Sequence, residues 1–416
     1  MSGLAFPCRI GYGIRFCRVF VDGQPTAASD PKEESDVKHW CHAILVCLLL
    51  LTLTGCGDQL YLENADIPLS VGLDMDDEGK IIVVSSAPVF NEEANKKTHF
   101  EQSTALSFRQ NRKLLNSQSQ GNVIAGKIQN LIISKQMLKR INAFPILDVI
   151  FRDPKSEINA RALVVDGSLE DLQNISMEDK GRLGIAIRDT IDAAHQVSST
   201  VLTRVIDFRG QMLDNRVTPY LTEMRIRGQD YAITGTALLN KDGKYATSLD
   251  QNESSLLLLL QHQTEYPLQL PFTAPLQLPF TTPPNMAPSD PTMSQMNVSL
   301  TINRYKISSD YAQGRFHFEF QVDLIANLSE RTFPFDMKTE RRKLEQVIEK
   351  QLQQKLERLI AKIQHHRLDP MGLGRVAQAY HYPIWKQVQN NWPETLAKAD
   401  IRVTPHVTIK SYGITF

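Results

Sequence analysis

The chain has 416 residues, and its 46 Lys and Arg residues balance 46 Asp and Glu residues, which leaves a formal net charge of zero. This neutrality argues against a nucleic acid as partner and against a polybasic membrane anchor. The length allows about two or three domains. All five cysteines lie at or before position 56, so the rest of the chain has no disulfide and depends on apolar cores for stability; they are Cys8, Cys17, Cys41, Cys47 and Cys56.

The most informative segment is 43–56, an apolar run that ends in Leu53-Thr54-Gly55-Cys56. It is shorter than the roughly 20 apolar residues that span a bilayer, but it suits the core of a signal peptide, about 7–15 residues. Its end matches the lipobox of bacterial lipoproteins, in which the cysteine thiol receives a diacylglyceryl group. We therefore expect acylation of Cys56 and an extracytoplasmic, membrane-tethered protein. The alternatives are an ordinary signal peptide and a buried hydrophobic helix that happens to end in Gly-Cys.

The segment before this run shows neither a helical nor a strand period. Signal peptides start with a short basic segment directly before the apolar core, which here is Lys38-His39-Trp40. Val37 could be encoded by GTG, an alternative bacterial start codon. We therefore interpret residues 1–36 as an over-extension of the reading frame and residues 37–55 as the signal peptide.

Residues 57–210 predict an N-terminal α/β domain. An opening hairpin, strands and helices alternate along it, which implies at least one crossover connection. The expected elements are a hairpin of 69–75 and 80–86, strands at 127–134 and 159–165, a helix at 136–151 broken near Pro145, and one long amphipathic helix at 183–208.

Residues 218–262 predict a middle domain. A strand at 220–227 precedes a hairpin of 231–239 and 244–249, whose turn is Lys241-Asp242-Gly243. Asp250 and Glu253 have the spacing of a capping box, which places the run Leu256–Leu260 on a helix.

Residues 263–294 predict a Pro-rich linker or insertion. They contain a tandem duplication, PLQLPFTA at 267–274 and PLQLPFTT at 275–282, followed by four further prolines up to Pro291. Proline at this density removes amide donors and disfavours helices and inner strands. We favour an exposed linker, and a Pro-rich docking segment is the alternative.

Residues 295–416 predict a C-terminal α+β domain. Apolar residues alternate over 296–307 and again over 316–324, which indicates a long antiparallel pair with one apolar face. The clearest helix is 343–364, whose single apolar stripe favours packing on the sheet over a coiled coil. A strand over 401–409 closes the chain.

Motifs for catalysis or for metal and cofactor binding are weak. Adjacent His365 and His366 point about 100° apart on a helix, which favours a solvated helix end over a metal site. The carboxylates Asp74, Asp76, Asp77 and Glu78 lack the spacing of a calcium loop and favour a hairpin turn. The sequence has no Walker loop, dinucleotide fingerprint or nucleophile elbow. We therefore expect no enzyme activity, no cofactor and no metal.

Several segments together resemble the Ger(x)C family, the lipoprotein C subunit of spore nutrient germinant receptors. The C-terminal block is the most specific, and the Pro-rich duplication looks like an insertion relative to the family. Pro370-Met371 also departs from the apolar-aromatic pair usual before the glycine. The segments that carry the resemblance are 55–58, 71–74, 148–153, 235–244 with Glu253-Ser254, 369–374, 382–385 and Asn391-Trp392.

The resemblance implies an α+β fold of successive domains, each with a mainly antiparallel sheet flanked by helices. It implies a non-enzymatic subunit that is lipid-anchored on the extracytoplasmic face of the inner membrane of the spore. The implied partners are integral-membrane A-type and B-type subunits of the receptor. A free-standing solute-binding lipoprotein is the alternative. The aromatic residues Trp385 and Trp392, with Tyr380 and Tyr382, either complete the C-terminal core or form a docking anchor for a membrane subunit.

Overall fold

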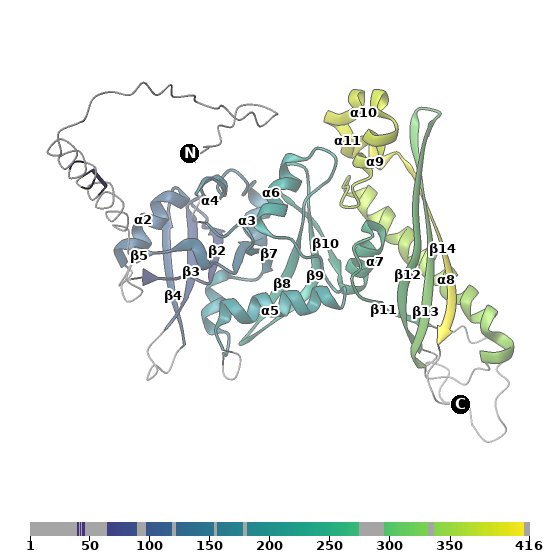
Figure 1. The fold of residues 1–416 in the computed structure, drawn as a ribbon, viewed down its shortest axis with the longest axis horizontal. Coiled ribbons are helices and arrows are strands. Elements are labelled where there is room, and N and C mark those ends of the chain that lie inside the picture. The colour runs from purple at the N-terminus through teal and green to yellow at the C-terminus, as the bar shows by residue number, and fades with distance from the viewer. Residues whose placement is uncertain are drawn as a thin grey trace, which may run out of the picture. The chain divides into compact units, whose positions relative to one another are not determined.

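The computed structural model describes residues 40, 42, 44–45, 65–89, 97–118, 122–153, 156–177, 181–273, 295–331 and 337–411. The chain forms two compact units, residues 1–61 and 62–416. The second unit contains two large β-sheets with helices packed against them (Figure 1). The expected α+β class is therefore confirmed.

The first sheet has eight strands in the order β10-β9-β8-β7-β6-β2-β3-β4. Its central strands β2, β6, β7 and β8 run parallel, and the pairings at both ends are antiparallel. The strands are β2 (Ser70–Met75), β3 (Ile81–Pro88), β4 (Thr98–Ala105), β6 (Asn130–Ser134), β7 (Arg161–Asp166), β8 (Tyr220–Arg227), β9 (Asp230–Leu239) and β10 (Tyr245–Asp250). A small parallel pair joins β1 (Ala65–Asp66) to β5 (Asn122–Val123).

The boundary expected between an N-terminal and a middle domain lies inside this sheet. Strands β8, β9 and β10 come from the segment 218–262, and β8 pairs directly with β7 of the preceding segment. The segment 218–262 therefore extends the first sheet and does not form a sheet of its own. The hairpin of β9 and β10 confirms the turn expected at 241–243, but the turn chemistry carries no information about which strand lies next to it.

Helices cover both faces of the first sheet (Figure 1). Adjacent strand residues point to opposite faces, so Leu131 and Ile133 pack on one helical layer and Ile132 on the other. One layer contains α2 (Phe108–Gln118), α3 (Lys135–Arg140), α4 (Asp148–Arg152) and α6 (Val205–Leu213). The opposite layer contains α5 (Leu183–Gln196) and the 3-10 turn Leu169–Asn174.

The single long helix expected at 183–208 is wrong. It is divided into α5 and α6, and Ser198 between them has a left-handed φ of 58°. Thr200 Oγ1 donates a hydrogen bond to the carbonyl oxygen of Gly235, and Thr203 Oγ1 donates one to that of Tyr220. Hydroxyl side chains compete with the helical hydrogen-bond ladder, and these two are satisfied by the sheet instead. The break expected near Pro145 is confirmed, since it separates α3 from α4.

The second sheet has four strands in the order β11-β12-β13-β14. These are β11 (Leu268–Thr273), β12 (Gln295–Ala312), β13 (Arg315–Arg331) and β14 (Asp400–Ser411). Adjacent strands are antiparallel except for the parallel pair of β13 and β14. The alternating residues of β13 are buried under helix α8 (Met337–His365), whose apolar stripe includes Leu344, Ile348, Leu352 and Leu356. The expectation that this helix packs on its own sheet is confirmed.

Strand β11 corrects the interpretation of 263–294 as a linker. It is formed by the first copy of the duplication, and Leu268, Leu270 and Phe272 are buried in the core. Pro271 is tolerated because β11 is the edge strand of the sheet, where a missing amide donor leaves no inner partner unpaired. The second copy, 275–282, lies outside the described residues.

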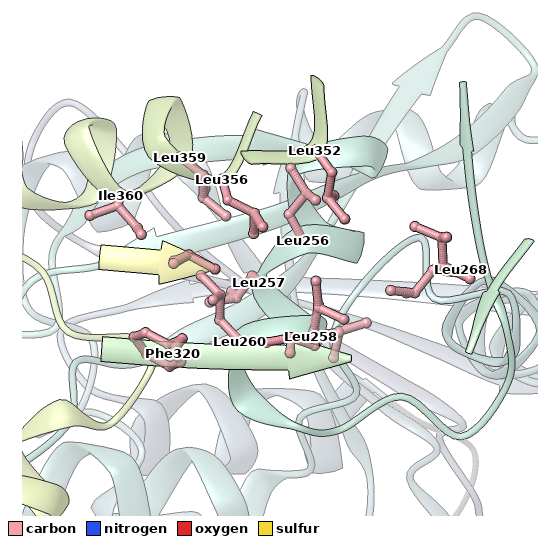
Figure 2. Close-up of a cluster of buried hydrophobic side chains, with 14 of the residues drawn as sticks. Leu256, Leu257, Leu258, Leu260, Leu268, Phe320, Leu352, Leu356, Leu359 and Ile360 are labelled. Atoms are coloured by element: carbon pink, nitrogen blue, oxygen red, sulfur yellow. The ribbon is translucent and has the colours of Figure 1, made fainter. Parts of the chain in front are cut away.

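Helix α7 (Gln251–Gln261) is buried among side chains of both sheets. It begins at the expected capping box, in which Asp250 and Glu253 each accept a hydrogen bond from the backbone N–H of the other. All five leucines of the run Leu256–Leu260 are buried, as expected of a helix enclosed on every side. Figure 2 shows Leu256, Leu257, Leu258 and Leu260 between Phe320 of the second sheet and Leu352, Leu356 and Leu359 of α8. Leu238 and Leu249 of the first sheet belong to the same cluster.

Three short helices follow α8: α9 (Leu373–Tyr380), α10 (Tyr382–Val388) and α11 (Trp392–Ala397). They lead into β14, the second edge of the sheet. The backbone N–H groups of Val407 and Ile409 in β14 donate to the carboxylates of Glu349 and Glu345 in α8, at 2.8 and 2.9 Å. Side chains of α8 thus occupy hydrogen-bonding groups that a sheet edge would otherwise leave open.

Candidate functional site

The residue expected to be acylated, Cys56, lies outside the described residues, as does the rest of the lipobox at 53–56. Of the expected signal peptide, residues 40, 42, 44 and 45 are helical with exposed side chains. Among the described residues, no helix is long and apolar enough to cross a membrane.

Of the two sets of candidate metal ligands, the histidines are exposed, while among the carboxylates Asp77 and Glu78 are exposed and Asp74 and Asp76 are half-buried. His365 is the last residue of α8 and His366 follows it, both exposed, with their rings nearly perpendicular at 88° and 5.2 Å apart. Asp76 Oδ1 accepts a hydrogen bond from the backbone N–H of Lys80 and closes the turn between β2 and β3. Within the described part of the chain, no group of three His, Cys, Asp or Glu side chains is placed to hold a metal ion.

A polar cluster lies at the C-terminal ends of the parallel strands, where α/β folds often build their sites. Lys135 follows β6 directly, and its Nζ lies 2.8 Å from Oε1 of Glu223 and 3.2 Å from Oδ2 of Asp166. Arg225 also donates to Asp166, and the hydroxyl of Ser248 is hydrogen-bonded to Glu223. The cluster therefore joins β6, β7, β8 and β10.

Electrostatics assign this cluster a structural role. Burial lowers the pKa of Lys135, but the hydrogen bond to Glu223 and its negative charge act more strongly and raise it above its ordinary value. Burial likewise raises the pKa of Asp166, while the hydrogen bonds from Arg225 and Lys135 overcome this and lower it. Lysine catalysis as a base or nucleophile requires a neutral amine. An ammonium held this firmly in its charged form serves to pair with carboxylates.

A second polar cluster is built around Asp369, whose side chain is fully buried. Its Oδ1 accepts hydrogen bonds from the backbone N–H groups of Gly372 and Leu373, at 2.8 and 2.9 Å. Its Oδ2 accepts from the N–H of Gly374 and from Nε1 of Trp392, both at 2.8 Å. Burial raises the pKa of the Asp369 carboxyl above its ordinary value, and these four donors reduce the shift without reversing it. The carboxylate thus stabilises the first turn of α9 and orients the indole ring.

The same residue connects the two sheets. The backbone N–H of Asp369 donates to Oγ1 of Thr218, two residues before β8, and its carbonyl oxygen accepts from the N–H of Thr218. Gly374 makes this approach possible, because a Cβ there would lie 2.7 Å from the carbonyl oxygen of Arg216. The motif 369–374 therefore fixes the second sheet and its helices against the segment that leads into β8.

The aromatic cluster is divided between core and surface. Trp385 and Trp392 are 2% and 1% exposed, with ring centroids 4.9 Å apart. Phe316 of β13 packs edge-on against Trp392 at 5.5 Å. Tyr380 and Tyr382, by contrast, are 72% and 54% exposed. The tryptophans therefore complete the C-terminal core, and only the two tyrosines face solvent.

An open groove of about 750 Å³ lies beside this core, between α6, the segment before β8, and helices α9 and α10. Its walls carry Asp214, Arg216 and Arg375. Both arginines bind the same carboxylate: Arg216 Nε lies 2.6 Å from Oδ1 of Asp214, and Arg375 Nη2 lies 3.1 Å from its Oδ2. Burial raises the pKa of Asp214, but the hydrogen bonds from Arg216 outweigh it and keep that pKa low. One carboxylate is therefore shared by two guanidinium groups, and the three side chains together keep one net positive charge.

Sequence reasoning missed both polar clusters. Lys135 and Glu223 are 88 positions apart, and no local pattern relates them. Asp369 was identified as part of a motif, but its role was not. The signal available was an Asp followed at short spacing by two glycines, which is typical of a carboxylate that caps a turn of backbone N–H groups.

Two family models match the chain and together cover most of it. The model described as "Spore germination protein N-terminal domain" matches residues 58–226. The model described as "Spore germination B3/GerAC like, C-terminal" matches residues 234–413. The passage from one match to the other falls at β8 and β9, within the first sheet.

Two spore germination proteins are similar to this chain over most of its length. Spore germination protein YndF of Bacillus subtilis (strain 168) is 21% identical, over 89% of this chain and 96% of that protein. Spore germination protein GerQC of Bacillus cereus is 19% identical, over 91% of this chain and 100% of that protein. A crystal structure of the GerBC protein matches with a TM-score of 0.49 and 13% identity, over 82% of this chain and 96% of that one. With both halves matched in the expected order, the chain belongs to the Ger(x)C family of spore germination proteins.

Proposed function

We propose that this chain is the lipid-anchored C subunit of a spore nutrient germinant receptor and that it works without catalysis. The observation that carries the proposal is the position of the lipobox. The N-terminal family match begins at residue 58, two positions after Cys56. A protein cleaved before Cys56 would retain the whole family region and would carry a diacylglyceryl group directly in front of it.

The proposed location follows from this anchor. With residues 37–55 as signal peptide, the protein is exported and stays on the extracytoplasmic face of the inner membrane of the spore. A diacyl group supplies two acyl chains, which are sufficient for stable anchoring. The partners in this proposal are the integral-membrane A-type and B-type subunits of the receptor. The family relationship supports them, because germinant receptors are assembled from such subunits.

A non-catalytic role is supported by the polar clusters. The buried charges at Lys135 and at Asp369 are satisfied by fixed protein partners, and each cluster ties elements of the fold together. Catalytic groups typically have a pKa matched to proton transfer near neutral pH, whereas the pKa of Lys135 is raised away from it. The alternative, a free-standing solute-binding lipoprotein, would require a ligand in the polar groove at Asp214, Arg216 and Arg375, where the charges already pair with one another.

The anchor is tested by Cys56→Ala, with Cys47→Ala as the matched control in the same segment. In cells that lack the partner subunits, we expect the Cys56→Ala protein to leave the membrane fraction and to lose acyl label. The Cys47→Ala protein should remain membrane-bound and labelled. Membrane fractionation of Cys56→Ala equal to that of the control would show that the anchor lies elsewhere.

The receptor assignment is tested separately by purification of the acylated protein from spore membranes in mild detergent. Co-purification of two integral-membrane subunits in fixed ratio supports the C-subunit role. A protein that purifies alone and binds a small solute in calorimetry, with the binding lost in Arg375→Ala, supports the solute-binding alternative instead.

A further inference from the structure

The tandem duplication contains two copies of nearly the same eight residues. The first copy, 267–274, contains β11, in which Leu268, Leu270 and Phe272 face the core. The second copy, 275–282, differs from the first only at its last residue, Thr282 in place of Ala274. It therefore has the same apolar residues in the same order, namely Leu276, Leu278 and Phe280.

The polar contacts of β11 are made by groups that the second copy also has. The side chain of Gln269 is hydrogen-bonded to the hydroxyl of Ser299, and the N–H of Thr273 donates to Oε1 of Gln351 at 3.0 Å. The ammonium of Lys355 lies 5.9 Å from the ring centre of Phe272. In the second copy the corresponding residues are Gln277, Thr281 and Phe280.

We propose that β12 pairs with either copy, 268–273 or 276–281, and that the two exchange by a shift of eight residues. A shift by one residue would turn every apolar side chain away from the core. A shift by eight, an even number, keeps all of them on the same face. The exchanged strand would therefore fill the core and form the same ladder as β11.

Chain connectivity permits both arrangements. With the first copy in place, six residues (262–267) join α7 to the strand and 21 residues (274–294) join the strand to β12. After exchange these connections have 14 and 13 residues. Because the entropy of loop closure depends only on the logarithm of length, this redistribution changes the ratio of the two arrangements by about twofold.

The exchange alters the tether between the two halves of the fold. Helix α7 is packed in the core shared by both sheets, and the six residues after it lead directly into the edge of the second sheet. Eight additional residues lengthen this tether by about 27 Å when extended. The duplication thus gives one chain two tether lengths at nearly equal free energy, because the same types of side chain fill the core in both arrangements.

Disulfide trapping tests the exchange in the full chain with Cys8, Cys17, Cys41, Cys47 and Cys56 replaced by serine. Gln269 and Ser299 face each other across β11 and β12, so Gln269→Cys/Ser299→Cys reports the first copy. Gln277→Cys/Ser299→Cys reports the second. Leu278→Cys/Ser299→Cys is the matched control, because Leu278 would face the opposite side of the sheet in the exchanged arrangement.

We expect the Gln277 disulfide to form at a rate within about threefold of the Gln269 disulfide and far faster than the Leu278 control. Peptide mass spectrometry identifies each bond. A Gln277 rate no higher than the Leu278 rate would mean that only chance collisions bring the second copy to β12, and the proposal would be overturned.

Paired substitutions provide an independent measurement. Leu270→Asp alone should shift the strand to the second copy, leave the melting temperature close to that of the unmodified chain, and raise the Gln277 cross-linking rate. Leu278→Asp alone should have no effect, and the double variant should melt several degrees lower. If Leu270→Asp melts as low as the double variant, the second copy does not replace the first.

Discussion

At the residue scale, the Asp369 carboxylate combines complete burial with four N–H donors. Asparagine has the same shape but cannot satisfy these donors. One of the two carboxylate oxygens is replaced by an amide NH2 group, which is itself a donor. The backbone of the motif 369–374 thus requires, at position 369, a side chain that only accepts hydrogen bonds.

Asp369→Asn should therefore lower the free energy of unfolding by about 3 kcal/mol, the cost of losing charged hydrogen bonds and leaving buried donors unpaired. Urea unfolding monitored by tryptophan fluorescence measures it, since Trp392 is one of the donors. Asp242→Asn, in the exposed turn between β9 and β10, is the control and should be neutral. Equal stability of the two variants would remove the structural role argued for Asp369.

The aromatic cluster gives a second prediction at this scale. Trp392→Ala should cost about 3–5 kcal/mol, since it removes a buried ring packed on Trp385 and Phe316. Tyr380→Ala, at an exposed position two helices earlier, should leave stability unchanged. If Tyr380→Ala keeps its stability but abolishes receptor assembly, the exposed tyrosines rather than the tryptophans form the docking anchor.

At the scale of elements, β11 reverses an expectation about the Pro-rich segment. A sequence of this composition is typical of an exposed linker, and the prolines at 267 and 271 conceal the alternation of Leu268, Leu270 and Phe272. This segment becomes a strand because the backbone of β12 pairs with it, and that partner cannot be recognised from the segment's own residues.

Deletion of 267–282 should therefore be strongly destabilising, because it removes three core side chains and exposes one side of β12. Deletion of 275–282 alone leaves β11 intact and should change the melting temperature little. Differential scanning calorimetry of both deletions provides the comparison. A neutral 267–282 deletion would restore the linker interpretation.

Sequence reasoning succeeded where one element carries its own signal. The bounds of β8, the turn at 241–243 and the capping box at Asp250 all depend on residues within a few positions of one another. It failed where distant groups decide the outcome. The break after Gln196 is stabilised by hydrogen bonds from Thr200 and Thr203 to the sheet, and the Lys135–Glu223 pair forms only once β6 and β8 are assembled.

The same limit applies to the candidate sites. The lipobox is read locally, so Cys56 could be proposed from the sequence, and it stays a prediction because it lies outside the described residues. The surface positions of His365 and His366 were also accessible from their spacing. Which buried charges pair, by contrast, depends on the order of strands in the first sheet, which propensities do not determine.

At the scale of the whole molecule, α7 makes the two sheets one unit. Its leucines share a core with Leu238 and Leu249 of the first sheet and Phe320 of the second. Contacts from Thr218 to Asp369 and from Gln261 to the carbonyl oxygen of Pro370 reinforce the connection. Neither half can bury its apolar surface fully when the other is unfolded.

Residues 62–416 should consequently unfold in a single cooperative transition, with equal calorimetric and van't Hoff enthalpies. Leu258→Ala should lower the stability of this unit by about 2–5 kcal/mol and keep one transition. Leu106→Ala, at a 75% exposed position, serves as control. Two separate transitions in the unmodified protein would show that the sheets are stable independently of α7.

The carboxylates of Glu345 and Glu349, which bind backbone N–H groups of β14, affect whether neighbouring molecules can associate through this strand. A lipid anchor, as proposed, confines the protein to a plane, where the local concentration of identical chains is high. An open strand edge under those conditions would template addition of a strand from the next molecule, and the product could grow into a polymer. The amides of Val407 and Ile409 are already occupied, and Pro405 between Thr404 and His406 has no amide hydrogen to offer. On a membrane, where the proposed anchor would hold the protein, the occupied part of this edge would favour a discrete assembly over an unbounded array.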